Sequence, residues 1–179
     1  PAPTPVPCTN ASVLNPSFDV LTPLGADWIQ VDPAYISLPD YPQGQTIFSS
    51  GFESGIVPLS APAMIWFGTG GQKQPGTTAT TSQSVHFNAR NRVLSWWQRT
   101  SAANLRAHSM SFQVIVDSSV LYDLHDVSEI SPLLGWHRIS VDVSAFADDA
   151  EHVLTFKSVN TRHSYFFVDN VELPCEPEP

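Results

Sequence analysis

Trp97 and Arg99 are the two residues of this chain best suited to hold a ligand. They lie two positions apart in residues 92–100, a segment that alternates as a β-strand does, so their side chains are expected on one side of a sheet. An indole offers a flat stacking platform and a guanidinium offers a fixed fork of hydrogen-bond donors. The pattern predicts a ligand-binding face there, with Leu94 and Trp96 facing a core on the other side. The alternative is that Trp97 and Arg99 are a half-buried pair on a covered sheet.

Further aromatic and polar residues extend this hypothetical site. The candidates for an aromatic wall around a ligand are Trp28, Trp66, Trp97, Tyr165 and Phe166. The candidates for hydrogen bonding to a ligand oxygen, and for a catalytic role if the protein is an enzyme, are Arg99, Gln113 and His163. An aromatic cavity of this kind could hold two apolar reactants close together, and the same residues would equally suit a sugar.

Other catalytic constellations are missing from the sequence. We find no Gly-x-Ser-x-Gly nucleophile motif, no His-Glu-x-x-His and no Cys/His cluster spaced for zinc. The glycines at 68–71 are followed by neither a helical pattern nor Gly-Lys-Ser/Thr, which argues against a phosphate-binding loop. Asp19, Asp169 or backbone oxygens could bind calcium but lack the spacing of a calcium loop, so we assign no metal ligands and leave a structural calcium open. We expect no cofactor.

The secondary-structure elements that would position these residues are predicted to be short strands. Alternating or apolar runs separated by turn residues predict strands at residues 13–19, 27–31, 62–68, 82–87, 92–100, 110–116, 120–124, 136–143, 152–156 and 165–173. Residues 32–55 and 72–81 read as loops, as do residues 101–108, and residues 144–150 allow one helical turn at most. With no sustained helical period, the predicted fold class is an all-β antiparallel β-sandwich.

Composition limits the classes of partner. The chain has 179 residues, of which 42% are hydrophobic and 14% charged, which fits one globular domain. Its net charge of −9 argues against nucleic acid as a partner, because a phosphate-binding face needs clustered Lys and Arg. No apolar run of about 18 residues is present, so we predict no membrane-spanning helix. The expected partner is a small molecule or a glycan, and the sequence leaves the oligomeric state open.

The ends of the chain favour a secreted protein. The start at Pro1 resembles a mature N-terminus left by signal-peptide removal, and Asn10-Ala11-Ser12 is a glycosylation sequon on Asn10. Cys8 and Cys175 lie outside the regular pattern, flanked by polar residues and proline. A disulfide between them would close a long loop and contribute about 5 kcal/mol in the chain-entropy model. The alternative is two unrelated free thiols.

Several motifs together resemble a known family. They are Asn15-Pro16-Ser17-Phe18, Val93-Leu94-Ser95-Trp96-Trp97, Trp136, His152-Val153-Leu154-Thr155-Phe156 and Phe167-Val168-Asp169-Asn170-Val171-Glu172-Leu173. This set is similar to the galactose-binding-like jelly rolls of CenC-type carbohydrate-binding modules. The resemblance extends from about Asn15 to Leu173 and implies a jelly roll of two antiparallel sheets, often with a structural calcium ion, and a sugar stacked on aromatic side chains. Together with the length of the chain, we expect a single jelly-roll domain over residues 1–179.

A second resemblance concerns architecture and size only. Fungal hetero-Diels-Alderases of tropolonic sesquiterpenoid biosynthesis are similar stand-alone, secretory-type jelly rolls. That resemblance implies a cofactor-free cyclase that dehydrates a hydroxymethyl tropolone to a quinone methide and guides its cycloaddition to a terpene alkene. Because the chain is aromatic-rich and poor in polar clusters, the leading hypothesis is this cyclase. The alternative is a carbohydrate-binding module or lectin without catalytic activity.

Overall fold

The computed structural model describes the central and C-terminal parts of the chain most fully. The residues described are 13, 28–31, 47–49, 59, 63–67, 77–102, 111–125, 135–160 and 164–175. The strands are β1 (Ile29–Val31), β2 (Ile47–Ser49), β3 (Ala63–Phe67), β4 (Thr77–Phe87), β5 (Val93–Ala102), β6 (Ser111–Val116), β7 (Ser119–Leu124), β8 (His137–Asp142), β9 (Ala150–Asn160) and β10 (Ser164–Glu172). A single turn of 3-10 helix, η2 (Ser144–Phe146), lies between β8 and β9.

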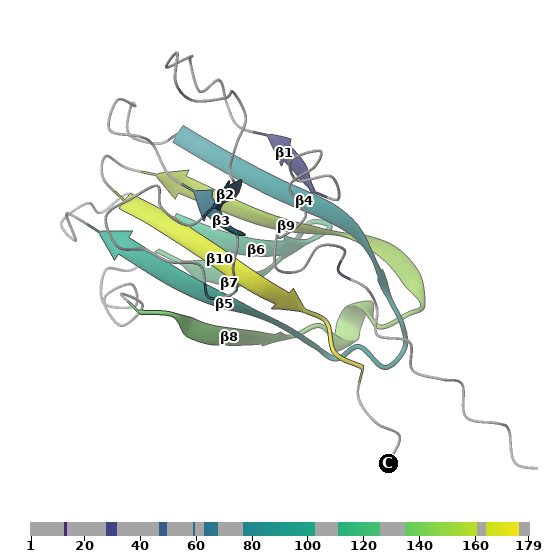
Figure 1. Ribbon diagram of the computed structural model, residues 1–179. Helices are drawn as coiled ribbons and strands as arrows, with labels where there is room; N and C mark the ends of the chain where they lie inside the picture. The colour runs from purple at the N-terminus through teal and green to yellow at the C-terminus, as the bar shows by residue number, and fades with distance from the viewer. Residues whose placement is uncertain are drawn as a thin grey trace, which may run out of the picture.

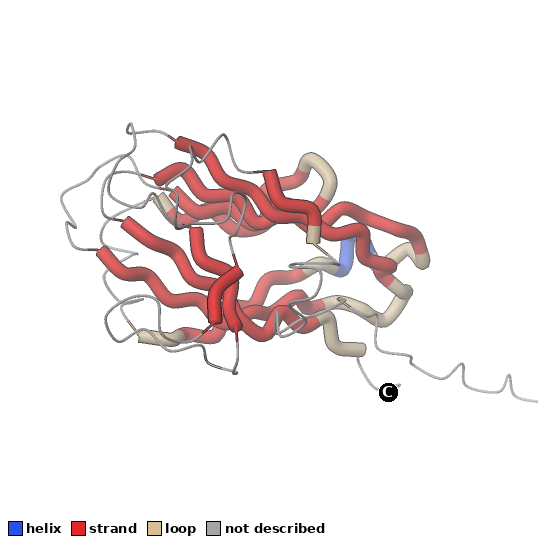
Figure 2. The backbone as a smooth tube through the Cα atoms, turned by 45° about the horizontal axis from the view of Figure 1, so that its top comes forward, coloured by secondary structure: helices blue, strands red, loops and turns tan. Residues whose placement is uncertain are grey.

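Within the described residues, two antiparallel sheets of five strands each form a sandwich, which confirms the predicted fold class. One sheet has the strand order β1-β4-β9-β6-β7 and the other β2-β3-β10-β5-β8. Figure 1 labels the strands, and Figure 2 shows the sheets as two stacked layers. β5 pairs with β10 on one side and β8 on the other, so the strand carrying Trp97 and Arg99 has a neighbour on each side.

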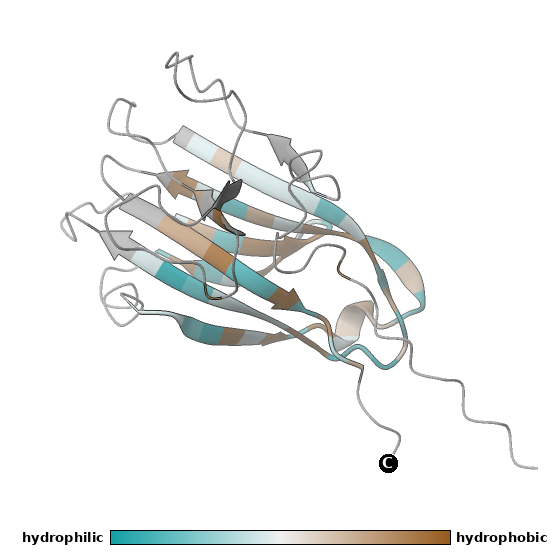
Figure 3. Ribbon diagram, viewed as in Figure 1, coloured by the Kyte–Doolittle hydropathy of each residue, from teal (hydrophilic) through white to brown (hydrophobic). Residues whose placement is uncertain are grey.

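The core between the sheets is built from the residues that alternate inward. Leu94 and Trp96 of β5 are fully buried, as the sequence pattern predicted. The Trp96 ring meets Phe156 of β9 edge-on, with ring centroids 5.8 Å apart, and thereby joins the two sheets. Phe112 of β6 contacts Phe166 of β10 across the same space at 5.1 Å. Figure 3 shows the matching alternation of hydrophilic and hydrophobic residues along β8. Aromatic contacts therefore fix how the sheets stack.

Most predicted strands within the described residues agree with the structure apart from their lengths, but parts of three predicted loops are strands. Residues 77–81, predicted as part of a loop, belong to β4, where Thr77 to Phe87 pair with Asn160 to Ala150 of β9. The loop prediction gave weight to the polarity of Thr-Thr-Ala-Thr-Thr, but threonine is β-branched and favours strands. β5 likewise continues to Ala102, and β2 lies inside the segment predicted as irregular. Of the predicted strand at residues 13–19, only Val13 is among the described residues.

A buried asparagine closes one end of the sandwich. Asn91, in the turn between β4 and β5, is fully buried. Its Nδ2 donates to the carbonyl oxygens of Leu173 and Pro174, at 3.2 Å each, and its Oδ1 accepts from the Asn88 backbone N–H at 2.8 Å. These bonds attach the turn to the end of β10. They hold β5 and β10 in their relative positions, and these two strands carry much of the candidate site.

Candidate functional site

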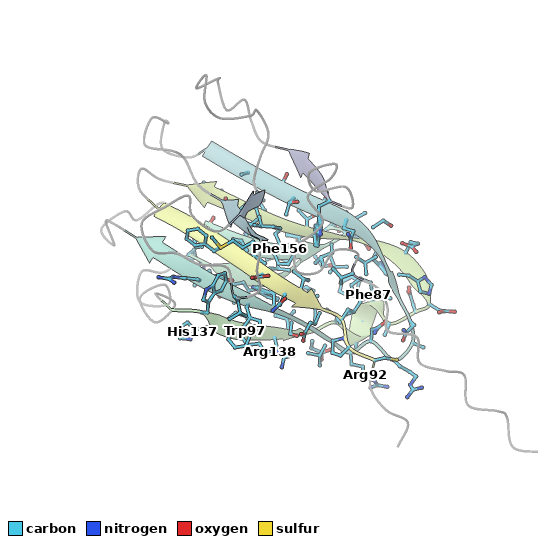
Figure 4. All side chains as sticks on the ribbon, in the orientation of Figure 1. Phe87, Arg92, Trp97, His137, Arg138 and Phe156 are labelled. Carbon is cyan, nitrogen blue, oxygen red and sulfur yellow. The ribbon has the colours of Figure 1, made fainter. Side chains whose placement is uncertain are left out.

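Trp97 lies on the outer face of the sheet β2-β3-β10-β5-β8. Odd-numbered residues of β5 point away from the core, because Leu94, Trp96 and Gln98 point into it. Trp97 is half-buried there, between Arg138 of β8 and Asp169 of β10, its register partners on the two neighbouring strands. Figure 4 shows Trp97 and Arg138 close together, far from Arg92 and Phe87 at the other end of the molecule. The indole therefore has a cation and a carboxylate as neighbours, both brought there by strand pairing.

An ion-pair network lies beside Trp97. Arg138 Nη2 donates to Glu172 Oε2 at 2.7 Å and to Ser95 Oγ at 3.0 Å. Ser95 is fully buried, whereas the side chains of Arg138 and Glu172 are 50% and 51% exposed. The network is therefore anchored in the sheet at one end and accessible to solvent at the other. Such a group of donors and acceptors can bind hydroxyl groups of a ligand.

Arg99, unlike Arg138, has no such network with the residues that the structure describes. It is half-buried on the same face, and its Nε is buried without a hydrogen-bond partner. A buried donor left unpaired costs about 1–3 kcal/mol. The Cα register partner of Arg99 is Phe167 of β10, which is 3% exposed. Arg99 therefore lies beside an apolar residue on the neighbouring strand.

The outer face is open at one side and covered at the other. Met64 of β3, Phe167 and Asp169 are all at most 5% exposed, although none of them belongs to the core between the sheets. In contrast, Arg138 and Ser140 of β8 are exposed and Trp97 is half-buried. The alternative of a covered sheet therefore holds for the β3–β10 side. The accessible part is the strip over β5 and β8, and we call it the β5–β8 strip.

Several residues expected at the ligand site lie elsewhere. Trp28 and Phe166 are buried in the core, where Trp28 packs on Phe156 at 5.9 Å, so they do not line the outer face. The expectation fails because a bulky aromatic at an inward position fills the core instead of facing solvent. Gln113 lies on β6, in the other sheet, and its Nε2 donates to Asp123 Oδ2 at 3.2 Å. Gln113 and Arg99 therefore do not form one site.

The remaining expected residues are described only in part. Trp66 belongs to β3 and Tyr165 to β10, but their side chains are outside the described part of the structure. His163, Cys8 and Asn10 lie outside the described residues altogether. Cys175 is half-buried, with its Sγ 3.9 Å from Asn88 Oδ1. Its pairing with Cys8 and the glycosylation of Asn10 stay predictions.

Arg138 and Glu172 were not expected at the site from the sequence, whereas alternation along residues 92–100 already places Ser95 on the face of Trp97 and Arg99. The position of Arg138 could have been predicted, because the side chains of residues 137–142 alternate between the outer face and the core. Arg138 falls in the outward series, as Trp97 does in its own strand. For Glu172 no comparable signal exists, because its closeness to Ser95 depends on an irregular register between β10 and β5 after Asp169.

A separate charged cluster lies at the other sheet. His152 of β9 places Nδ1 2.8 Å from Asp117 Oδ2 and Nε2 2.9 Å from Asp148 Oδ1. These hydrogen bonds raise the pKa of His152 above its usual 6.5, and the bond with Asp117 has the larger effect. The pKa values of Asp117 and Asp148 are both lowered below the usual 3.8. In each case the main cause is the hydrogen bond with His152. Because a carboxylate only accepts hydrogen bonds, making both bonds requires a doubly protonated imidazole.

Neither a metal centre nor a spanning helix is evident in the described ranges. Among those residues, no group of three or more His, Cys, Asp or Glu side chains is arranged to hold a metal ion. No helix within the same ranges is long and apolar enough to cross a membrane.

Comparisons with known proteins identify the fold but not the family. No protein-family model matches the chain, and no curated protein matches it in sequence. A family 61 carbohydrate-binding module solved in complex with β-1,4-galactotriose has a similar structure, with a TM-score of 0.60 at 11% identity, covering 94% of this chain and all of that one. The K2 adhesin domain of Lys-gingipain has a TM-score of 0.56 at 12% identity, covering 83% of this chain and 90% of that one.

A third structure belongs to the same group of folds. The K3 adhesin domain of Lys-gingipain from Porphyromonas gingivalis has a TM-score of 0.52 at 12% identity, covering 92% of this chain and 96% of that one. At these identities the likeness concerns the fold alone. The chain is a two-sheet antiparallel β-sandwich structurally similar to carbohydrate-binding modules and to adhesin domains.

Proposed function

We propose that this protein binds a glycan on the β5–β8 strip. The observation that carries the proposal is the half-buried indole of Trp97 on an outer sheet face, with Arg138, Ser95 and Glu172 beside it. An indole stacks on the apolar face of a sugar ring, and the neighbouring polar groups can bind its hydroxyls. The fold supports the proposal, because a similar sandwich binds β-1,4-galactotriose in the family 61 module. A glycan-binding role also suits the secreted location that we propose from the sequence.

The cyclase hypothesis has less support than the glycan binder. A cyclase would need its aromatic wall and its polarising donors around one enclosed cavity. Of the expected wall, Trp28 and Phe166 are in the core, and of the expected donors, Arg99 and Gln113 are on different sheets. A strip along a sheet fits a chain of sugars better than it fits two enclosed apolar reactants.

A glycan array followed by calorimetric titration tests the proposal. We expect binding to at least one oligosaccharide, and we expect Trp97→Ala to weaken it at least about tenfold, because the stacking surface is lost. The free energy of unfolding should change by less than about 1 kcal/mol, since Trp97 lies outside the core.

The matched control removes an exposed apolar side chain from the other sheet. Val120 of β7 is 50% exposed, and Val120→Ala should leave glycan affinity unchanged. Undiminished binding by Trp97→Ala would place the site elsewhere on the protein. Absence of binding to every glycan tested would contradict the proposed function.

A further inference from the structure

Arg99 is a half-buried cation that has no counter-ion among the described residues. Its Nε is buried and unpaired, and none of the described carboxylates lies within 4.0 Å of its guanidinium. Arg138, the other arginine on this face, is held by Glu172 at 2.7 Å. Buried or half-buried guanidinium groups are ordinarily paired, because desolvation of the charge is costly without a partner. Among the described residues, therefore, no side chain forms an ion pair with the guanidinium that Arg99 presents from β5.

We propose that Arg99 binds the carboxylate of an acidic sugar, so that the ligand is a glycan containing uronic acid. This inference rests on the proposed function and names the chemical class of its ligand. A planar carboxylate matches the guanidinium fork with two parallel hydrogen bonds, and the bond is stronger than one to a neutral hydroxyl because both groups are charged. Because Nε itself is buried, a uronate pairs with the terminal Nη atoms of Arg99 and balances the charge of the guanidinium, which a neutral sugar does not.

The position of Arg99 relative to Trp97 supports this assignment. The two residues are separated by two positions on β5 and lie on the same face, which places their Cα atoms about 7 Å apart. A sugar ring stacked on the Trp97 indole, or the ring next to it along the strand, can therefore present a carboxylate to Arg99. Arg99 would then select the ligand, while Trp97 supplies stacking that is common to acidic and neutral sugars.

Among the described charged side chains of this face, Glu172 and Asp169 already have hydrogen-bond partners, so Arg99 is the group that favours an anionic ligand. Glu172 is already paired with Arg138. Asp169 is fully buried, and its Oδ1 accepts the backbone N–H of Asn170 at 2.8 Å. The protein as a whole has a net charge of −9, which disfavours long polyanions. We therefore expect the preference to be clearest with short oligosaccharides.

The test is a calorimetric titration with matched acidic and neutral oligosaccharides. The probes are tri- to pentasaccharides of galacturonate, glucuronate and mannuronate, each compared with the same oligosaccharide after reduction of its carboxyl groups to alcohols. We expect at least one uronate to bind about tenfold or more tightly than its reduced counterpart. Arg99→Gln removes the charge and Arg99→Lys removes the fork. Each should weaken uronate binding by about 10- to 100-fold and change neutral-sugar affinity by less than about threefold.

Control variants separate this inference from the proposed function. Arg92→Gln removes the same charge just before β5, at the far end from Trp97, and should leave the uronate affinity unchanged.

Equal affinity for acidic and neutral sugars, or an equal loss for both in Arg99→Gln, would overturn the assignment of Arg99. In either case, if Trp97→Ala still abolished binding of the sugars, the proposed glycan-binding function would stand. If every sugar of the array and the panel failed to bind, both proposals would fall. Urea unfolding of each variant checks that it is folded.

Discussion

Replacing His152 by phenylalanine removes two hydrogen bonds and keeps an aromatic ring in the same place. The imidazole bridges Asp117, in the turn between β6 and β7, and Asp148, in the loop before β9. Its ring also packs edge-on against Phe87 and Phe146, with centroids 5.3 and 5.4 Å away. His152→Phe can preserve these ring contacts, so its effect reports on the charged hydrogen bonds.

The expected loss follows from how exposed each partner is. A hydrogen bond to a charged group contributes about 1.5–3 kcal/mol when it is sheltered, but exposed ion pairs contribute only about 0.2–1 kcal/mol. The side chain of His152 is 12% exposed and that of Asp117 is 47% exposed, so their bond lies between these limits. The side chain of Asp148 is 58% exposed, so solvent screens its bond to His152 more strongly and this bond contributes little to stability. We expect His152→Phe to lose about 1 kcal/mol at pH 5.5, or about 2–4 °C in Tm.

This loss should depend on pH in a definite direction. The raised pKa of His152 gives stability that is complete below pH 6.5 and disappears as pH rises through the folded-state pKa. The lowered pKa values of Asp117 and Asp148 give stability that is complete above pH 3.8 and disappears as pH falls through their folded-state values. The difference between the wild type and His152→Phe should therefore be largest between pH 4 and 6.5 and should shrink toward zero at pH 9.5.

Urea unfolding at pH 5.5, 7.5 and 9.5 measures this difference. The matched control is His86→Phe, because His86 also faces a carboxylate, Asp149 at 3.0 Å, but is 46% exposed. We expect the control to change stability by less than about 0.5 kcal/mol at each pH. The same loss for His152→Phe at pH 5.5 and at 9.5 would refute the reasoning, because it would come from ring packing and not from protonated hydrogen bonds.

Three further substitutions test other parts of the structure by urea unfolding. Asn91→Ala should lower the free energy of unfolding by about 2 kcal/mol, because it leaves the carbonyl of buried Leu173 without its donor; a loss below 0.5 kcal/mol would contradict that role. Arg99→Leu should raise the free energy of unfolding by about 1 kcal/mol, since it removes an unpaired buried donor, and a fall would show that Arg99 has a structural partner. Glu172→Gln should cost less than about 0.5 kcal/mol because its pair with Arg138 is half exposed, and a larger loss would mean that the network stabilises the fold.

Much of the fold was predictable because alternation is a local property. The pattern of residues 92–100 assigned Leu94 and Trp96 to the core and Trp97 and Arg99 to the outer face, and the burial of β5 agrees. The same rule located most of the described strands. It was wrong at residues 77–81, where a polar composition concealed a strand that becomes evident through its pairing with β9.

The surroundings of Trp97 were decided by tertiary structure. Arg138 and Asp169 lie 41 and 72 positions further along the chain (138 − 97 and 169 − 97) and become its neighbours only because β8 and β10 pair with β5. Similarly, His152 contacts Asp117 only because β6 pairs with β9. The sequence by itself determined which side of its strand each residue faces, since that follows from a period of two. Strand order and register decided which charges meet, since they result from packing the whole core.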